Sequence, residues 1–170
     1  MTTIMIGENH IGWDSQIDFG TEKFDYGVPK VTVDADGIWA RAGGVSLTEH
    51  AVKLLKSGAC LAETDNFLSH CEAGGGFEVL RMWRVCTLST WEVRFWSENT
   101  PHGFTPPLPL AMGSGGPLAM GAYLGSDGDV RKTMEIACKM DQATGGKITI
   151  ASLDVMKDEH DKLRRWKTSK

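Results

Sequence analysis

Residues 1–16 of the chain read MTTIMIGENHIGWDSQ, and this stretch decides the fold. Two short apolar runs, residues 2–6 and 11–16, flank a polar turn at residues 7–10, which predicts a β-hairpin at the start of the chain. An initiator methionine is normally removed when the next residue is as small as threonine. Thr2 would then carry a free α-amino group at the beginning of the first strand.

An N-terminal threonine has a specific chemical use. A threonine hydroxyl is a poor nucleophile alone, but an α-amino group on the same residue, with an ordinary pKa of about 7.7–8.0, can accept its proton. Many intracellular proteins also begin Met-Thr without being enzymes, so Thr2 by itself does not predict catalysis. The rest of the sequence has to supply the groups that surround such a nucleophile.

Length and composition indicate an ordinary globular protein. At 170 residues with 41% apolar residues, the chain is most simply one domain, which we place at residues 1–156, followed by a charged tail at residues 157–170. The net charge of −4 gives no electrostatic reason to expect nucleic acid as a partner. Because no apolar run reaches transmembrane length and no secretory signal pattern is present, we expect no membrane partner and a cytoplasmic location.

Metal, nucleotide and conventional serine chemistry find little support. The five histidines are scattered singly, no serine lies in a Gly-x-Ser-x-Gly elbow, and the glycine clusters lack the spacing of phosphate-binding or dinucleotide-binding loops. We therefore expect no cofactor and no metal. The four cysteines show no metal-type or redox-type spacing and are expected to be buried free thiols: Cys60, Cys71, Cys86 and Cys138.

The strands are predicted in groups. A second hairpin is expected from residues 30–33 and 38–42 around an Asp-Ala-Asp-Gly turn. Residues 77–96 read as two strands with a turn near Ser89, and residues 147–155 as a last strand. Consecutive hairpins favour antiparallel sheets, and helices grouped between strand pairs favour layers over alternating βαβ units.

The helices are predicted from capping and periodicity. Ser46 with Glu49 three residues later is a capping box, and Gly58 is placed to end that helix. The charged tail reads as a solvated helix or a frayed end rather than a docking segment. Further helices are expected over residues 61–72, from Pro117 to Tyr123, and from Val130 to Met140 with Asp129 as its cap.

Two charged residues stand out at strand ends. Asp14 lies in an otherwise apolar strand, and Lys30 opens another strand directly after a proline. Either residue alone is compatible with an ordinary surface charge. Together they are compatible with a buried ion pair that sets the electrostatic potential around a nearby hydroxyl. Such a pair is better explained by function than by stability, because desolvation can cancel its Coulomb gain.

Six short motifs carry a family resemblance. They are Thr2-Thr3-Ile4, Ile11-Gly12-Trp13-Asp14-Ser15-Gln16, Lys30-Val31, Ala42-Gly43-Gly44, Gly113-Ser114-Gly115-Gly116 and Asp141-Gln142-Ala143-Thr144-Gly145-Gly146. In this order, from Thr2 to about Ser152, the chain resembles the proteasome β-subunit superfamily of N-terminal nucleophile hydrolases, including HslV-type peptidases. The resemblance implies an α+β fold, a four-layer αββα sandwich. The region between Gly44 and Phe77 is too short for the family's two long helices, so one helical layer is expected to be shortened.

The resemblance also implies residue roles. Thr2 Oγ would attack the scissile carbonyl with its own α-amine as proton acceptor, and Lys30, paired with Asp14, would favour the ionised hydroxyl electrostatically. The backbone N–H of Gly43 would stabilise the tetrahedral oxyanion. Three further residues would hydrogen-bond around the amine and fix its position: Ser114, Asp141 and Thr144.

The function implied is a threonine-type peptidase that acts on peptides or unfolded proteins. It would assemble as a homo-oligomer, for which the sequence favours no particular ring size. An unfoldase ATPase is a compatible partner. Maturation would need only the removal of Met1, and a retained Met1 would block the site. Two alternatives stay open: a catalytically silent structural or inhibitory ring component, and an amidase that acts on a small molecule.

Overall fold

The computed structural model divides into two compact units, each of which is described by itself. The first unit comprises Met1–Val31 and Pro107–Met156, and the second comprises Thr32–Pro106 and Lys157–Lys170. The residues that the structure describes are 2–19, 22–25, 29–64, 67, 69, 71, 76–85, 90–142 and 144–169.

The first unit contains a four-stranded antiparallel sheet in the order β10-β2-β1-β9. Its strands are β1 (Ile4–Ile6), β2 (His10–Trp13), β9 (Leu110–Met112) and β10 (Thr149–Ser152). The predicted first hairpin is confirmed: Ile4 pairs with Trp13, and the N–H of Gly7 donates to the carbonyl of His10 at 2.9 Å across the turn. The start of the chain is therefore a central strand, with β9 as its second neighbour.

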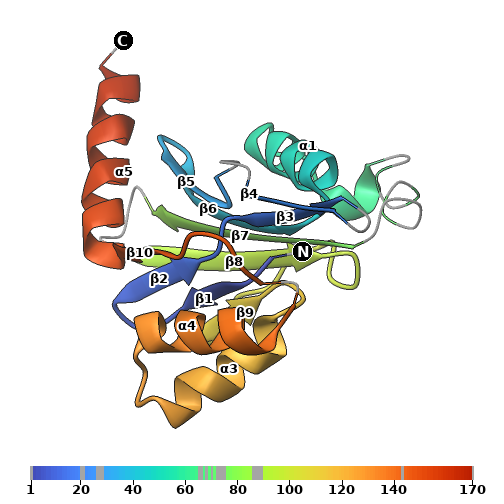
Figure 1. Ribbon diagram of the computed structural model, residues 1–170. Coiled ribbons are helices and arrows are strands. Elements are labelled where there is room, and N and C mark those ends of the chain that lie inside the picture. The colour runs from blue at the N-terminus through green and yellow to red at the C-terminus, as the bar shows by residue number, and fades with distance from the viewer. Residues whose placement is uncertain are drawn as a thin grey trace. The chain divides into compact units, whose positions relative to one another are not determined.

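Two helices cover one face of this sheet, α3 (Gly116–Gly125) and α4 (Val130–Met140) (Figure 1). The predicted cap of α4 is confirmed, because the Asp129 carboxylate accepts the backbone N–H of Lys132 at 3.0 Å. Gly12 allows the close approach of α4, since a Cβ there would lie 2.8 Å from side-chain atoms of Val130 and Met134. The buried residues of this core are Met5, Ala119, Tyr123, Val130, Met134 and Ala137.

A separate two-stranded antiparallel sheet follows β2 and was not expected from the sequence. It consists of β3 (Gln16–Phe19) and β4 (Glu22–Asp25), with Gln16 opposite Asp25. The predicted strand over residues 11–16 thus ends at Trp13, and Gln16 begins the next strand. The segment that follows β2 therefore pairs with β4 instead of continuing the first sheet.

The second unit contains another antiparallel sheet, in the order β5-β6-β7-β8. Its strands are β5 (Val31–Asp34), β6 (Gly37–Gly43), β7 (Phe77–Arg84) and β8 (Trp91–Ser97), which confirms the predicted second hairpin and the strand pair over residues 77–96. The Asp34 carboxylate accepts the N–H groups of Asp36 (2.8 Å) and Gly37 (3.1 Å), so this side chain closes the β5–β6 turn. Of the turn predicted near Ser89-Thr90, Ser89 lies outside the described residues, while the Thr90 carbonyl accepts the N–H of Val85 at 3.1 Å.

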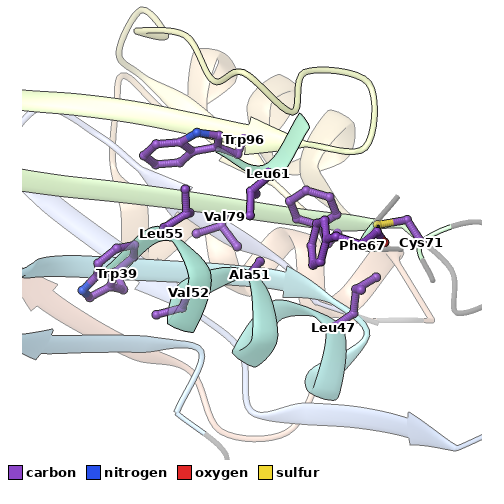
Figure 2. Packing of buried hydrophobic residues seen from close by; sticks show 11 residues of the cluster. Trp39, Leu47, Ala51, Val52, Leu55, Leu61, Phe67, Cys71, Val79 and Trp96 are labelled. Atoms are coloured by element: carbon purple, nitrogen blue, oxygen red, sulfur yellow. The ribbon is translucent and has the colours of Figure 1, made fainter. Parts of the chain in front are cut away.

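Helix α1 (Val45–Lys56) packs over β6 and β7 (Figure 1). Figure 2 shows Ala51, Val52 and Leu55 of this helix gathered with Trp39 and Val79 of the strands. The remaining buried residues of this cluster are Leu47, Leu61, Phe67, Cys71, Phe77 and Trp96. The α1 face that packs on the sheet is therefore an apolar stripe of residues at helical spacing.

The capping-box prediction for α1 is wrong. The helix begins at Val45, its N-cap is Gly44, and the N-cap makes no side-chain hydrogen bond. The Thr48 N–H already donates to the Gly44 carbonyl at 2.9 Å, so Ser46 lies inside the first turn and cannot cap it. The predicted end is confirmed, with Ser57 as C-cap and Gly58 at a φ of +82°.

Helix α5 (Leu153–Thr168) replaces the end of the predicted last strand and continues through the charged tail. In the second unit its His160 is only 1% exposed, and the ring Nδ1 hydrogen-bonds the Asp34 carbonyl at 2.7 Å. Asp161 pairs with Arg84. The tail is thus an ordered helix with one anchored face. Between α1 and β7, the first part of the predicted 61–72 helix is the short 3-10 helix η1 (Leu61–Glu63), and the described residues 67, 69 and 71 are helical, while residues 65, 66, 68, 70 and 72 lie outside the described residues.

The predicted α+β class with antiparallel sheets is confirmed. Each unit combines one four-stranded sheet with a helical layer, which are the components expected of the αββα arrangement. In the described part of the chain, no helix is both long and apolar enough to cross a membrane.

Candidate active site

Asp14 is the centre of the polar cluster in the first unit. It follows β2 directly, and its N–H donates to the Thr3 carbonyl at 3.3 Å, which extends the β1–β2 ladder by one residue. The side chain is 0% exposed. Its Oδ1 accepts the Thr3 N–H at 2.8 Å, and its Oδ2 accepts the Gly145 N–H at 3.2 Å. A buried carboxylate needs such donors, because burial without partners strongly disfavours its charge.

Lys30 supplies the counter-charge to Asp14. Its Nζ lies 2.8 Å from Asp14 Oδ1 and also donates to the Gln16 carbonyl at 2.7 Å. The lysine is 6% exposed, so both charges of the pair are held away from water. The buried ion pair expected from the sequence is therefore present in the structure.

Thr3 connects this ion pair to a second polar chain. Its side-chain Oγ1 lies in a short contact with Thr144 Oγ1, and Thr144 Oγ1 donates to Asp141 Oδ2 at 2.6 Å. Thr3 is 0% and Thr144 is 3% exposed. Thr3 is thus fixed on both sides, by its backbone to Asp14 and by its side chain to the Thr144–Asp141 pair.

Gly115 closes the cluster from the loop that precedes α3. A Cβ at this position would lie 2.0 Å from Thr3 Oγ1 and 2.6 Å from Thr144 Oγ1. Only glycine therefore fits between these hydroxyl groups without displacing them. Its neighbour Ser114 is exposed, and the role of Ser114 beside an amine stays a prediction.

Gln16 ties the 141–146 turn to the start of β3. Its N–H donates to the Gly145 carbonyl at 3.1 Å, and its Nε2 donates to the Gln142 carbonyl at 3.3 Å. A Cβ at Gly145 would lie 2.3 Å from Gln16 Oε1, so the turn and the side chain are in close contact. The Asp141–Gly146 motif and the Asp14–Lys30 motif therefore form one polar cluster.

The charge of this cluster extends to α4. Burial raises the pKa of the Cys138 thiol, and the negative charge of Asp14 raises it further, while Lys30 opposes this effect. Cys138 is accordingly disfavoured as a thiolate. Among the described residues, no group of three or more His, Cys, Asp or Glu side chains is placed to hold a metal ion.

The two remaining predicted residues occupy different units. Thr2 directly precedes Thr3 in the first unit and is 6% exposed. Gly43 ends β6 in the second unit, where it has a φ of +108° and where a Cβ would lie 2.2 Å from the Gly76 carbonyl oxygen. The backbone conformation and this close approach both require glycine.

Sequence reasoning missed Thr3, Gly115 and Gln16 as members of the cluster. Each lies inside a motif that the sequence singles out, but the roles predicted for these motifs are assigned to neighbouring residues or to the motif as a whole. The available signal was the tight glycine spacing at residues 113–116, since closely spaced glycines often mark a place where the backbone comes close to another group.

Solved structures provide the comparison. Eukaryotic HslV from Trypanosoma brucei matches with a TM-score of 0.58 at 15% identity, covering 89% of this chain and 97% of that one. Thiobacillus denitrificans BPH in complex with epoxomicin matches with a TM-score of 0.56 at 16% identity, covering 89% and 97%. Neither the protein-family models nor the curated proteins give a match. The chain therefore has the HslV and proteasome-subunit fold, as its motifs predicted.

Proposed function

We propose that this protein is a threonine-type peptidase in which Thr2, after removal of Met1, is the nucleophile. One observation carries the proposal: the buried Asp14–Lys30 pair lies against the backbone of Thr3, the residue next to Thr2. A buried ion pair is a poor stabilising device, because the cost of desolvation offsets much of its attraction. Its position beside Thr2 gives it a chemical reason to be there.

In the proposed reaction, Thr2 Oγ attacks the scissile carbonyl and its proton passes to the Thr2 α-amine, directly or through a water molecule. The ammonium group of Lys30 favours the ionised hydroxyl, and Asp14 holds that ammonium in place. The acyl-enzyme ester on Thr2 is then hydrolysed. The neighbouring Thr3 anchor restricts the backbone that carries both reacting groups, which supports a fixed geometry for the attack.

The remaining roles rest on the resemblance. Ser114, Asp141 and Thr144 would position the α-amine, and the N–H of Gly43 would stabilise the oxyanion, an effect worth about 3–4 kcal/mol in other hydrolases. The Thr144–Asp141 hydrogen bond and its contact with Thr3 support the first of these roles. We further propose a cytoplasmic homo-oligomer that cleaves peptides or unfolded proteins and is compatible with an unfoldase ATPase.

The experiment begins with the intact mass of the purified protein. A dominant species without Met1 is required, and a dominant species that retains it would contradict the peptidase. Peptide cleavage should fall at least about 10³-fold in Thr2→Ala, because the nucleophile is lost. Thr2→Ser is the matched control, which keeps a hydroxyl and should remain active and labelled by epoxomicin, the ligand of the BPH structure.

The alternatives give different results in the same experiment. A silent ring component would assemble by size-exclusion mass but show equal, negligible cleavage in the wild type and in Thr2→Ala. A small-molecule amidase would hydrolyse simple amides in a Thr2-dependent manner and leave a peptide library intact.

A further inference from the structure

Cys60 and His102 form a thiol–imidazole pair in the second unit, outside the candidate active site. Cys60 directly precedes η1, and its Sγ lies 3.9 Å from Nδ1 of His102, on the loop that follows β8. Cys60 is half-buried and His102 is exposed. The sequence-based expectation of buried thiols is therefore met by Cys71, at 6% exposure, but not by Cys60 or Cys138, which are half-buried.

The His102 loop is held by hydrogen bonds. The Thr100 N–H donates to the Ser97 carbonyl at 3.0 Å, and the Gly103 N–H donates to the Thr100 carbonyl at 2.9 Å. Arg94 Nη2 donates to the His102 carbonyl at 3.0 Å. The imidazole is thus presented to Cys60 by an ordered turn with a guanidinium bound to it.

This environment favours a reactive thiol. The thiolate is the nucleophilic form of cysteine, and it is favoured beside histidine and arginine in partly exposed positions. With the histidine proton on Nε2, Nδ1 of His102 can accept the thiol proton, and hydrogen bonds of this kind are often long before a reactant binds. Arg94 adds positive charge to the same turn.

The other described thiols lack these features. The Cys71 thiol is buried and donates to the Phe67 carbonyl at 3.3 Å. The pKa of Cys138 is raised by burial and by Asp14. Cys60 is therefore the described cysteine whose surroundings combine a base, a positive charge and access to solvent.

We propose that Cys60 and His102 form a nucleophilic thiol site that is modified by low-molecular-weight disulfides. His102 Nδ1 takes the thiol proton, and the Cys60 thiolate attacks one sulfur of the disulfide. A new S–S bond forms on Cys60, the original S–S bond breaks, and the other half leaves as a thiolate that takes up a proton. The reaction needs no further oxidant, because the incoming disulfide supplies the oxidising equivalents.

The test uses the full chain and oxidised glutathione. The parent protein carries Cys86→Ser, so that every thiol that can react is one of the described cysteines, since Cys86 lies outside the described residues. Intact mass gives the rate of adduct formation, and peptide mapping gives its position. At pH 7 we expect Cys60 to react at least about tenfold faster than Cys71 and Cys138. Faster reaction at either of those cysteines would overturn the proposal.

His102→Gln separates a chemical role from a packing role. Its rate at Cys60 should fall about fivefold or more at pH 7, because the group that takes the thiol proton is lost. His10→Gln, which replaces an exposed histidine of β2, is the matched control and should react like the parent. Equal rates in the parent and His102→Gln at pH 7, with unchanged urea midpoints, would refute the pairing. If His102→Gln lowers the midpoint, His102→Asn takes its place and the same comparison of rates at pH 7 decides.

Discussion

Each unit contains aspartate–lysine pairing, and two of these pairs, Asp14–Lys30 and Asp34–Lys56, differ in environment. In the first unit, the side chains of Asp14 and Lys30 are 0% and 6% exposed. In the second unit, those of Asp34 and Lys56 are 32% and 36% exposed. The chemical groups are the same, but only the first pair has been removed from water, so the two pairs isolate the effect of burial on one type of interaction.

The partners of the two aspartates explain the difference. Asp34 closes its own turn, and its Oδ1 also accepts the indole N–H of Trp39 at 3.3 Å, while Lys56 adds a contact from the end of α1. Asp14 instead accepts N–H groups from two distant segments, at Thr3 and Gly145. The exposed pair serves local structure, whereas the buried pair joins the segments of the candidate active site.

The largest expected effect on stability comes from removing the lysine of the buried pair, and removing the lysine of the exposed pair gives the comparison. Lys30→Met leaves the Asp14 carboxylate buried without its counter-charge, and we expect a loss of about 3–5 kcal/mol in the free energy of unfolding. Lys56→Met removes a solvent-screened partner, with an expected loss of about 0–1 kcal/mol. Urea unfolding at pH 7 measures both values.

The two lysine variants are matched controls for one another, because each replaces a lysine by an apolar side chain of similar length. Similar losses in the two variants would contradict the distinction between the pairs. A Lys30→Met protein as stable as the wild type would show that Asp14 does not depend on Lys30 for its burial.

A smaller effect is expected from the glycine that closes the buried cluster. Gly115→Ala places a methyl group against Thr3 and Thr144, and we expect a loss of about 1–3 kcal/mol from overpacking. Gly121→Ala is the control, because no atom lies within 4 Å of a Cβ there and alanine favours the helix by about 1 kcal/mol. A Gly115→Ala protein at least as stable as the wild type would mean that the Thr3 cluster can move aside.

The buried pair was predictable from sequence, while its closest neighbours were not. Asp14 and Lys30 are charges at the ends of apolar strands, and both positions are read directly from local pattern. Thr3 joins the cluster through Thr144 and Gly115, which lie more than a hundred residues away along the chain, so no local pattern reports the contact. The fit of glycine between two hydroxyl groups is a property of the packed structure.

The fold shows the same division. The hairpins, the Asp129 cap and the Gly58 helix end follow from turn and capping chemistry within a few residues, and all three predictions are confirmed. The Ser46 capping box fails because the helix starts two residues earlier than a Ser46 cap requires, directly after Gly44. The β3–β4 hairpin is not predicted because the second apolar run, residues 11–16, is taken through Gln16, where a new strand begins.

The smallest expected effect concerns pH and the exposed pair. Burial raises the pKa of Asp34, but the hydrogen bonds from Lys56 and Asp36 and the charge of Lys56 outweigh it, so the pKa lies below its ordinary value of 3.8. A carboxylate whose pKa is lower in the folded than in the unfolded protein stabilises the fold at any pH above its unfolded-state pKa. This stabilisation is lost as the pH falls through the folded-state pKa, because the carboxylate is then protonated. The stability difference between the wild type and Lys56→Met should therefore be constant near pH 7, shrink below about pH 4 and continue to fall toward pH 2 as the carboxylate is protonated. Urea unfolding across this range measures the stability difference. Lys53→Met, at the same end of the helix, is the control, and its stability difference should not change with the protonation of Asp34.

A difference that persists unchanged at pH 2 would mean that Lys56 stabilises the protein through its contact with the Trp39 ring, 5.5 Å from its Nζ, rather than through the carboxylate.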